Sequence, residues 1–557
     1  MMNFFDFVPK SISSLSKGYS LAMFRGDFMA GLTVSIVALP LAMALAIASG
    51  TTPEKGLFTA IIAGFLISLL GGSRHQIGGP TGAFVVIIYN VIAQFGYEGL
   101  AIATVMAGIM LLIAGILKVG TIIRFIPQPV VTGFTSGIAI VLFTGQIKSL
   151  LGLSIENMPA DFVDRWVVYW QHIQTIHWPT LMIGGVSLAI LFVLQSLKVR
   201  LPSFLIVMTL GGGIVWLFGV PVDTIGSKFG QIPKTLPVPY FPHITWEKIV
   251  LLLPSAFTIA FLAGIESLLS AMIADGMTGR RHRPNAELLA QGVANIASVC
   301  FCGIPATGAI ARTITNIRSG AQTPLAGIIH SALLLLFMWF LSPIVGWIPL
   351  TSLAAVMIIV AWNMSEIEHF RYLMSAPKSD RAVLLITFFL TIMVDLTIAV
   401  QVGITLAALL FMKRMNDVTA IQTGVSILKS TANEKTDSLP PKMPEGVEAF
   451  QITGPFFFCV ANRLKDELAK IRGIPKVFIL RMRHVPTMDA TAAHTLLSFI
   501  KKSQQRGTHV IFAAVQEQPL KVMKQMKIHK LISPENFVSS TVDAIKRAQK
   551  ILESEKT

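Results

Sequence analysis

The sequence predicts a polytopic α-helical membrane protein followed by a small α/β domain. Of its 557 residues, 53% are hydrophobic and only 13% are charged, whereas soluble domains carry about 25% charged residues. Apolar runs long enough to cross about 30 Å of hydrocarbon recur before the polar stretch that follows Lys413. A purely soluble protein is therefore excluded.

Fourteen candidate spans can be placed. Two of them, 80–95 and 307–318, are short, and each begins at a Gly/Pro cluster, IGGPTG or CGIPATG. Matched breaks in the two halves of a chain are typical of an inverted repeat with its substrate site at the bilayer midplane. The alternative is that these residues only help helices to pack. The spans are 27–49, 56–71, 80–95, 99–118, 124–150, 176–197, 201–219, 252–277, 286–304, 307–318, 324–343, 347–364, 381–394 and 396–413.

Basic residues flank alternate connections between the spans, including the run Arg280 to Arg283. By the positive-inside rule, both termini are cytoplasmic, and the connections 152–175 and 220–248 lie outside. Residues 1–26 are expected to be a cytoplasmic segment rather than a signal peptide, because they have no hydrophobic region of that kind. The transport domain is then 27–415.

Beyond the spans, a polar stretch with Pro-Pro predicts a linker over 416–445. Short apolar runs then alternate with amphipathic helical patterns, which predicts a cytoplasmic α/β domain over 446–557. Residues 441–557 contain 19 Lys/Arg against 10 Asp/Glu, within a net charge of +16 for the chain. They contain no recognised nucleic-acid motif, so proximity to the anionic lipid bilayer explains the charge better than nucleic acid does.

Glu266 is an acidic residue in the middle of the span 252–277. Such a residue costs at least about 2.5 kcal/mol on insertion scales, so it should face a cavity or a partner. We expect it to bind a proton reversibly, with Ser270 one turn away on the same helix face. The alternative is that Glu266 only pins two helices together.

The stretch GIPATGAIARTITNI predicts a half-helix that starts inside the membrane. Thr307 is a suitable cap, and the first-turn amides then lack partners within the helix and attract anions. Arg312 adds a positive charge that either contacts the anion or neutralises Glu266. The predicted amide donors are Gly308, Ala309, Ile310 and Ala311.

The stretch GGPTGAFVVIIYN repeats this arrangement in the first half, where Thr81, Gly82, Ala83 and Phe84 begin a second half-helix. Two facing N-termini can enclose an anion without a metal. Phe84 either lines the pocket or belongs to the core.

No cofactor, metal site or enzymatic activity is predicted. The chain has no dinucleotide or Walker motif and no GxSxG elbow. His75, His282 and His330 are single and scattered, which favours packing or surface roles over metal ligation.

Across essentially its whole length the chain resembles the sulfate permease (SulP) family with a C-terminal STAS domain. The resemblance rests on separated motifs in the family's order, and among subgroups it is strongest to the C4-dicarboxylate transporters, through PLAMALA, IESLL, DGMTG, AIAR and AWNMSE. The longer motifs are DFMAGLTVSIVALPLAMALAIASG, GGSRHQIGGPTGAFVVI, GFTSGI, GIESLLSAMIADGMTGRRHRPNAELLAQGVANI and GAIARTITNIRSGAQTPLAG.

The resemblance implies a 7+7 inverted repeat in which a core domain moves against a gate domain, with substrate between the third and tenth spans. Glu266 matches a position that carries Glu in proton-coupled members, which favours protons over sodium, and Arg312 matches a basic position. Ala38 and Leu41 stand where animal and plant members commonly carry glutamines, which mildly favours an organic carboxylate. A homodimer in a bacterial inner membrane is also implied.

The resemblance therefore predicts proton-coupled symport of C4-dicarboxylates such as succinate or fumarate. Bicarbonate or sulfate, with proton or sodium coupling, is the alternative. A remote alternative is a membrane receptor that signals to a regulatory protein partner. In the STAS domain, TMDATAAHTL resembles a loop that can be phosphorylated in stand-alone regulators, here at Asp489 and Thr491. Alternatively, Thr491 only caps a helix.

Overall fold

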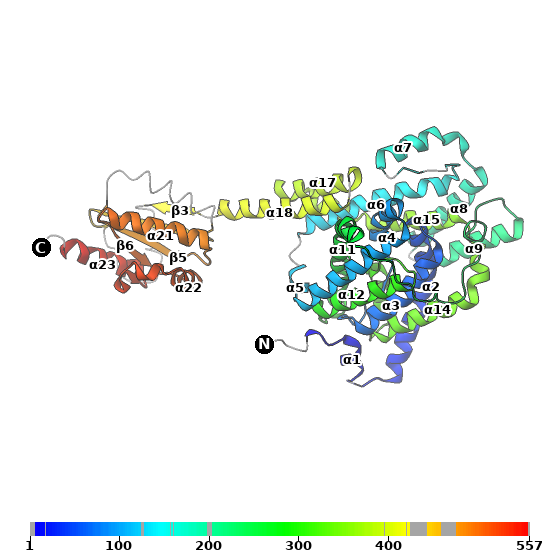
Figure 1. The fold of residues 1–557 in the computed structure, drawn as a ribbon, viewed down its shortest axis with the longest axis horizontal. Helices are drawn as coiled ribbons and strands as arrows, with labels where there is room; N and C mark the ends of the chain where they lie inside the picture. Colours follow the sequence, from blue (N-terminus) through cyan, green and yellow to red (C-terminus); the bar gives the residue numbers. More distant parts are fainter. Residues whose placement is uncertain are drawn as a thin grey trace. The chain divides into compact units, whose positions relative to one another are not determined.

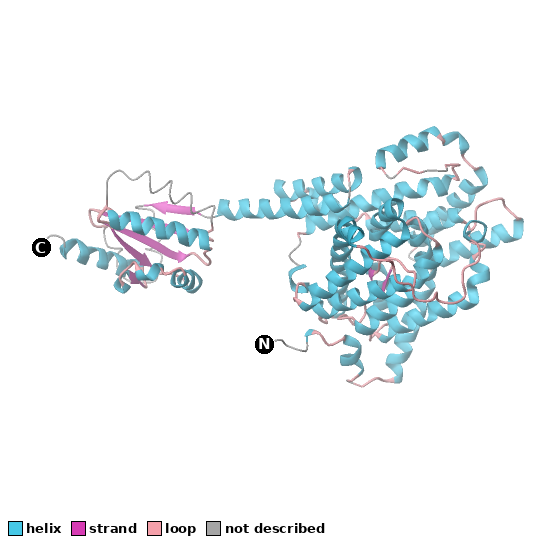
Figure 2. Ribbon diagram, viewed as in Figure 1, coloured by secondary structure: helices cyan, strands magenta, loops and turns pink. Residues whose placement is uncertain are grey.

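The computed structural model describes residues 6–16, 18–123, 127–155, 158–159, 161–197, 203–394, 396–418, 420–423, 443–457 and 475–554. The chain divides into two compact units, Met1–Ala407 and Ala408–Thr557. Figure 1 labels their helices and strands in chain order. The described part of the first unit is almost entirely helical, and that of the second combines helices with a sheet (Figure 2).

The first unit consists of helices of very different length and two short strands. Its elements are α1 (Lys10–Leu15), α2 (Leu21–Ala48), α3 (Pro53–Leu70), β1 (Gly78–Gly79), α4 (Gly82–Ile116), α5 (Gly120–Ile123), α6 (Gln128–Leu151), α7 (Phe162–Gln171), η2 (Ile173–Thr175), α8 (Trp178–Ser196), α9 (Ser203–Phe218), α10 (Ile225–Phe229), α11 (Trp246–Thr278), α12 (Pro284–Cys300), β2 (Thr307–Gly308), α13 (Ile310–Arg318), α14 (Leu325–Val345), α15 (Leu350–Met364), α16 (Ile367–Met374), α17 (Lys378–Met393) and α18 (Leu396–Val418), the last of which continues into the second unit.

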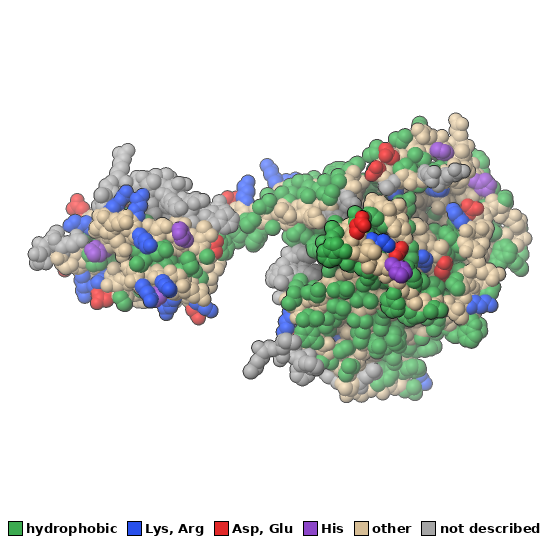
Figure 3. All heavy atoms as spheres, viewed as in Figure 1, with side chains coloured by type: hydrophobic (Ala, Val, Ile, Leu, Met, Phe, Trp, Pro, Cys, Tyr) green, Lys and Arg blue, Asp and Glu red, His purple; other side chains and the backbone are tan. Residues whose placement is uncertain are grey.

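Among the described residues, nine helices are long and apolar enough to cross a membrane. One of them, α4, combines two predicted spans, 80–95 and 99–118. It bends between them at Gly96, whose φ of 67° and ψ of −175° are not helical. Glycine adopts such a conformation without steric cost, so it lets one continuous segment change direction. The surface of this unit is rich in apolar side chains in the view of Figure 3.

The same order of elements occurs twice: two long helices, a two-residue strand and a helix that starts at a break. The first set is α2, α3, β1 and α4, and the second is α11, α12, β2 and α13. The two strands pair antiparallel, with Gly78 opposite Gly308 and Gly79 opposite Thr307. The breaks of the two halves therefore lie side by side, enclosed by helices (Figure 2).

Small residues let α2 and α3 pack closely. Ala38, Ala42 and Ala46 are fully buried on α2. A Cβ added at Gly56 of α3 would lie 2.0 Å from the carbonyl oxygen of Ala42. Close backbone approach through small residues is how helices associate where no hydrophobic driving force is available.

We expect Gly56→Ala to destabilise the membrane unit by about 1–3 kcal/mol or to prevent its folding, because the new methyl group meets backbone that cannot move alone. The matched control is Gly185→Ala on α8, where an added Cβ has no neighbour within 4 Å. Thermal unfolding of the two purified variants in detergent checks this expectation. Equal melting temperatures would contradict the packing described for α2 and α3.

The second unit is an α/β domain with a five-stranded sheet in the order β3-β4-β5-β6-β7. The edge strand β3 is antiparallel to β4, and the remaining pairs are parallel. Its elements are β3 (Ala420–Thr423), β4 (Val447–Thr453), β5 (Val477–His484), α21 (Ala490–Gln505), β6 (His509–Ala513), α22 (Glu517–Gln525), η3 (Ile528–Lys530), η4 (Pro534–Asn536), β7 (Phe537–Val538) and α23 (Thr541–Ser554).

Helices cover both faces of this sheet. One apolar cluster joins the strands to Leu496 and Ile500 of α21, and a second joins them to Ala544 and Ile551 of α23. A helical membrane unit followed by such a domain confirms the predicted fold class. β3 falls inside the range 416–445 that the sequence assigns to a linker, and residues 424–442 of that range lie outside the described residues.

Candidate functional site

Glu266 of α11 contacts the break in the opposite half of the repeat. The hydroxyl of Thr81, which precedes α4, donates a hydrogen bond of 2.8 Å to Glu266 Oε2. Glu266 is half-buried and Thr81 is 9% exposed. Within the described part of the chain, no Lys, Arg or His forms an ion pair with Glu266. The alternative in which Arg312 neutralises this carboxyl by direct pairing is therefore not observed.

Arg312 makes the reciprocal contact from α13 to the first half. Its Nη2 donates to the carbonyl oxygen of Pro80 at 3.2 Å, and the side chain is only 2% exposed. A Cβ at Gly79 would lie 2.6 Å from Arg312 Nη1, and Gly79 has a φ of +151°. Glycine at this position therefore makes room for the guanidinium and permits the backbone conformation.

The buried guanidinium of Arg312 has unused hydrogen-bonding capacity. Its Nε and Nη1 have no hydrogen-bond partner among the described residues. A buried charge is costly unless it is paired and hydrogen-bonded. An anion beside Arg312 would satisfy both requirements, so this arrangement can bind one.

The start of α13 differs from the predicted one. The helix begins at Ile310 with Ala309 as its cap, and the expected cap, Thr307, lies in β2. The amide of Gly308 donates to Ser267 Oγ at 3.0 Å, and that of Ala309 donates to the Ile77 carbonyl at 2.8 Å. The prediction that these two amides are free donors is wrong, because Ser267 of α11 and the Ile77 carbonyl before β1 accept their hydrogen bonds.

The first-turn amides of α13 are instead those of Ile310, Ala311 and Arg312, which have no earlier helical turn to bond to. Ala311 is exposed and Ile310 is partly exposed. An anion at this helix end can therefore reach backbone donors as well as the Arg312 side chain.

At the other break, Thr81 is the residue before α4, but its hydroxyl binds Glu266 and makes no cap hydrogen bond. Gly82 and Ala83 are buried in the first turn, and a Cβ at Gly82 would lie 2.5 Å from Met364 Sδ. Phe84 is fully buried in an apolar cluster with Phe134. Of the two roles predicted for Phe84, its position matches the core role.

Ser270 is fully buried and donates to Thr313 Oγ1 at 3.1 Å. Thr313 Oγ1 also accepts from the Ile77 amide at 3.1 Å. This geometry ties α11, α13 and the segment before β1 together. Ser270 therefore positions the half-helix, and it makes no hydrogen bond to Glu266 among the described contacts.

A row of polar residues on α12 supports the second break and was not identified from the sequence. Asn295 Nδ2 donates to the Ala306 carbonyl at 2.8 Å, and its Oδ1 accepts from the Ala306 amide at 2.9 Å. Glu287, Gln291, Asn295 and Ser298 recur at spacings of four, four and three residues, which places them on one helix face. That spacing is the signal that could have found them.

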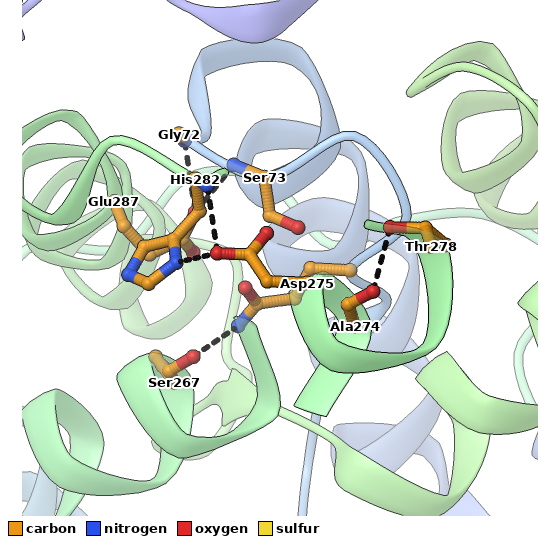
Figure 4. Close-up of polar contacts among 9 residues, drawn as sticks. Gly72, Ser73, Ser267, Ala274, Asp275, Thr278, His282 and Glu287 are labelled. Carbon is orange, nitrogen blue, oxygen red and sulfur yellow. Dashed lines mark hydrogen bonds and ion pairs between the residues drawn. The ribbon is translucent and has the colours of Figure 1, made fainter. Parts of the chain in front are cut away.

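Glu287 and Asp275 hold the loops at one end of the site (Figure 4). Glu287, fully buried, accepts from the amides of Gly72 at 2.8 Å and Ser73 at 3.2 Å. Asp275 Oδ2 accepts from the His282 amide at 2.9 Å and contacts His282 Nδ1 at 2.6 Å. These bonds fix the loop before β1 against α12 and the turn between α11 and α12.

A cavity of about 620 Å³ opens beside this end of α11. Its apolar wall includes Ile265 and Leu269, the first of which is adjacent in sequence to Glu266, and its polar rim includes Arg280 and His282. The cavity therefore lies along the same turns of α11 as Glu266, and Glu266 itself does not line it.

Crossed membrane breaks with a buried cation, together with a C-terminal STAS-type domain, define the class of polytopic membrane transporters. The model of the sulfate permease family matches residues 24–387, and that of the STAS domain matches residues 441–545. The chain therefore belongs to the sulfate permease family.

Two similar proteins cover nearly the whole chain. "Putative sulfate transporter YvdB" of Bacillus subtilis is 40% identical over 94% of this chain and 97% of its own length. "Bicarbonate transporter BicA" of Picosynechococcus is 29% identical over 94% of each chain. The family assignment thus rests on full-length similarity.

Solved structures show the same fold. The murine anion transporter Slc26a9 in its inward-facing state superposes with a TM-score of 0.87 at 17% identity, over 99% of this chain and 95% of its own. The transmembrane domain of a cyanobacterial BicA gives a TM-score of 0.62 at 26% identity, over 70% of this chain and 98% of its own.

We expect Arg312→Met to leave the unfolding temperature unchanged or to raise it, and to abolish anion binding. A buried cation without an acidic partner costs folding free energy, so an apolar side chain of similar length should not lower the stability. Thermal unfolding and equilibrium binding of labelled sulfate and succinate to the purified variant check both parts. A large loss of stability with normal binding would assign Arg312 a structural role instead.

Proposed function

We propose that this protein is a secondary active anion transporter that couples anion movement to protons. The main observation behind the proposal is that two charged side chains of the second half, Arg312 and Glu266, bind adjacent residues at the first break. Arg312 binds the Pro80 carbonyl, while two of its donor atoms have no partner among the described residues, and Glu266 binds the adjacent residue, Thr81. A cation without an acidic partner in the described part of the chain and a titratable carboxyl therefore contact adjacent residues.

This proximity supplies a coupling mechanism. An ionised Glu266 repels an anion bound at Arg312, and the repulsion is strong where water is scarce. Protonation of Glu266 removes the repulsion, so the proton and the anion favour each other's binding. By reciprocity, the anion must raise the proton affinity by the same factor. Sodium, the less favoured coupling ion, would need oxygen ligands around Glu266.

Movement of a core domain against a gate domain, in an elevator-like cycle, is part of the proposal. The breaks, α11 and α13 would belong to the moving core. Small residues line the contact between α6 and α17, where Gly133 and Gly137 lie close to the backbone of Leu384 and Phe388. Tight packing of this kind suits a rigid gate.

Two substrate classes remain in the proposal, each favoured by a different observation. The similarity to a putative sulfate transporter and to a bicarbonate transporter favours sulfate or bicarbonate. The apolar positions Ala38 and Leu41 favour a C4-dicarboxylate with hydrocarbon between its charges. Both are buried in an apolar cluster that also contains Val85 and Leu142, close to the start of α4.

The experiment that tests the function is uptake into proteoliposomes under an imposed pH gradient, with labelled sulfate, bicarbonate and succinate, each with and without sodium. Accumulation driven by the pH gradient supports the proposal, and the preferred anion identifies the substrate class. Accumulation driven only by sodium would contradict proton coupling, and no flux of any anion would favour the receptor alternative.

We expect Glu266→Gln to reduce pH-driven accumulation at least tenfold while exchange of internal for external anion continues, because a permanently neutral side chain cannot carry the proton. Glu247→Gln is the matched control, since Glu247 is exposed in the first turn of the same helix. Its accumulation should equal that of the wild type. Undiminished accumulation by Glu266→Gln would remove Glu266 from the coupling mechanism.

We infer a homodimer in a bacterial inner membrane with both termini cytoplasmic, and native mass spectrometry of the purified protein tests the dimer.

In the STAS domain, Asp489 caps α21 by accepting from the Ala492 amide at 2.7 Å, whereas Thr491 is exposed in the first turn. A phosphate on Thr491 would be favoured by the helix end and could regulate docking of a protein partner. Phosphopeptide mapping of native protein tests this.

A further inference from the structure

A second cavity, of about 510 Å³, lies among α4, α6, α7 and α10. One end is lined by Val85 and Leu142, near the start of α4. The other end is lined by three cationic side chains, Lys148, Arg165 and Lys228, and we call this space the cationic cavity. It is separate from the cavity beside Asp275 and His282 and shares no lining residue with it.

Arg165 of α7 is the most buried of the three cations, with 7% of its surface exposed. Its Nε donates to the Pro159 carbonyl at 2.8 Å, and its guanidinium carbon lies 5.0 Å from the centre of the Tyr89 ring. These two contacts hold the guanidinium plane in place. Its Nη atoms make no hydrogen bond among the described residues, and Nη1 lies 3.9 Å from a Cβ built at Gly145 of the cavity wall.

Lys148 and Lys228 add two ammonium groups to the same space. Lys148, in the last turn of α6, donates to the Ile155 carbonyl. Lys228 of α10 is exposed and lines the same cavity as Lys148. The described residues that line the cavity include no Asp or Glu. Three like charges in one cavity create a positive potential that concentrates anions.

The cationic end lies a short way from the breaks. A Cβ at Gly82, in the first turn of α4, would lie 3.7 Å from Leu142. Lys148 follows Leu142 by six residues on the same helix, which is about 9 Å at 1.5 Å per residue. An anion held at the cations is thus about two helical turns from the start of α4.

We propose that the cationic cavity is an entry site that binds the transported anion before it reaches the breaks. The ligand class is a small inorganic or carboxylate anion, because the donors are point charges and a guanidinium in a space of limited volume. The inference rests on the proposed transport function for its role, although anion binding at the cavity does not depend on transport.

The first test is the kinetics of anion uptake by Lys228→Glu in proteoliposomes. At low ionic strength, KM should rise about tenfold with little change in kcat, and the difference should shrink at high salt because exposed charges are screened. The matched control is Lys234→Glu, an exposed lysine in the same connection that does not line the cavity. Equal KM values for the two variants would overturn the entry role.

The second test measures binding without transport. Pyridoxal phosphate, an anionic amine reagent, should label Lys228 faster than Lys234 in the purified wild-type protein, and added sulfate or succinate should protect Lys228 selectively. If the wild-type protein transports no anion, the proposed function fails while this protection still reports on the cavity. If labelling of both lysines is equal and unprotected, the cavity is not an anion site, whatever the transport result.

Discussion

The antiparallel pairing of β1 with β2 is the interaction on which the rest of the site depends. Backbone donors and acceptors at membrane depth must be satisfied within the protein. Each half of the repeat breaks its helical path, and the opposite half supplies the partners, with Gly78 opposite Gly308 and Gly79 opposite Thr307. Each break therefore supplies hydrogen-bond partners to the other.

This pairing determines which residues of the first half the two charged side chains contact. Because the strands cross, Glu266 of the second half reaches Thr81 of the first, and Arg312 reaches Pro80. The two charged side chains contact neighbouring residues without pairing to each other. An ion pair between them would satisfy both and leave nothing for a substrate, so the proposed binding of an anion and a proton requires that they stay apart.

Other polar side chains form hydrogen bonds with backbone groups near the breaks. Asn295 satisfies both polar atoms of Ala306, and the Ile304 amide donates to Thr59 Oγ1 at 2.7 Å. Asp27, fully buried on α2, accepts from the amides of Gln322 and Thr323 at 2.7 and 3.1 Å. These residues fix the segments on either side of α13.

The spans, the two breaks and Glu266 could be predicted because long apolar runs, Gly/Pro clusters and a lone intramembrane acid are local signals. The start of α13 could not, since the amides of Gly308 and Ala309 bind Ser267 and Ile77, which are distant in sequence. Strand β3 was assigned to a linker because a four-residue edge strand has too few residues to show alternation.

The fold class could be predicted because helix periodicity and hydropathy are properties of each segment alone and do not depend on the segments it contacts. Asn295 and Asp27 were missed because their hydrogen bonds join separate segments. The residues that position the site can therefore be identified only in the structure, whereas its charged residues can be identified from the sequence.

The proposed coupling between Glu266 and the anion can be measured as proton uptake on anion binding. Labelled sulfate or succinate is added to the purified protein in weak buffer near neutral pH, and the pH change is recorded alongside the amount bound. We expect uptake of up to about one proton for each anion bound, because the anion raises the proton affinity of Glu266. Anion binding without proton uptake would contradict it.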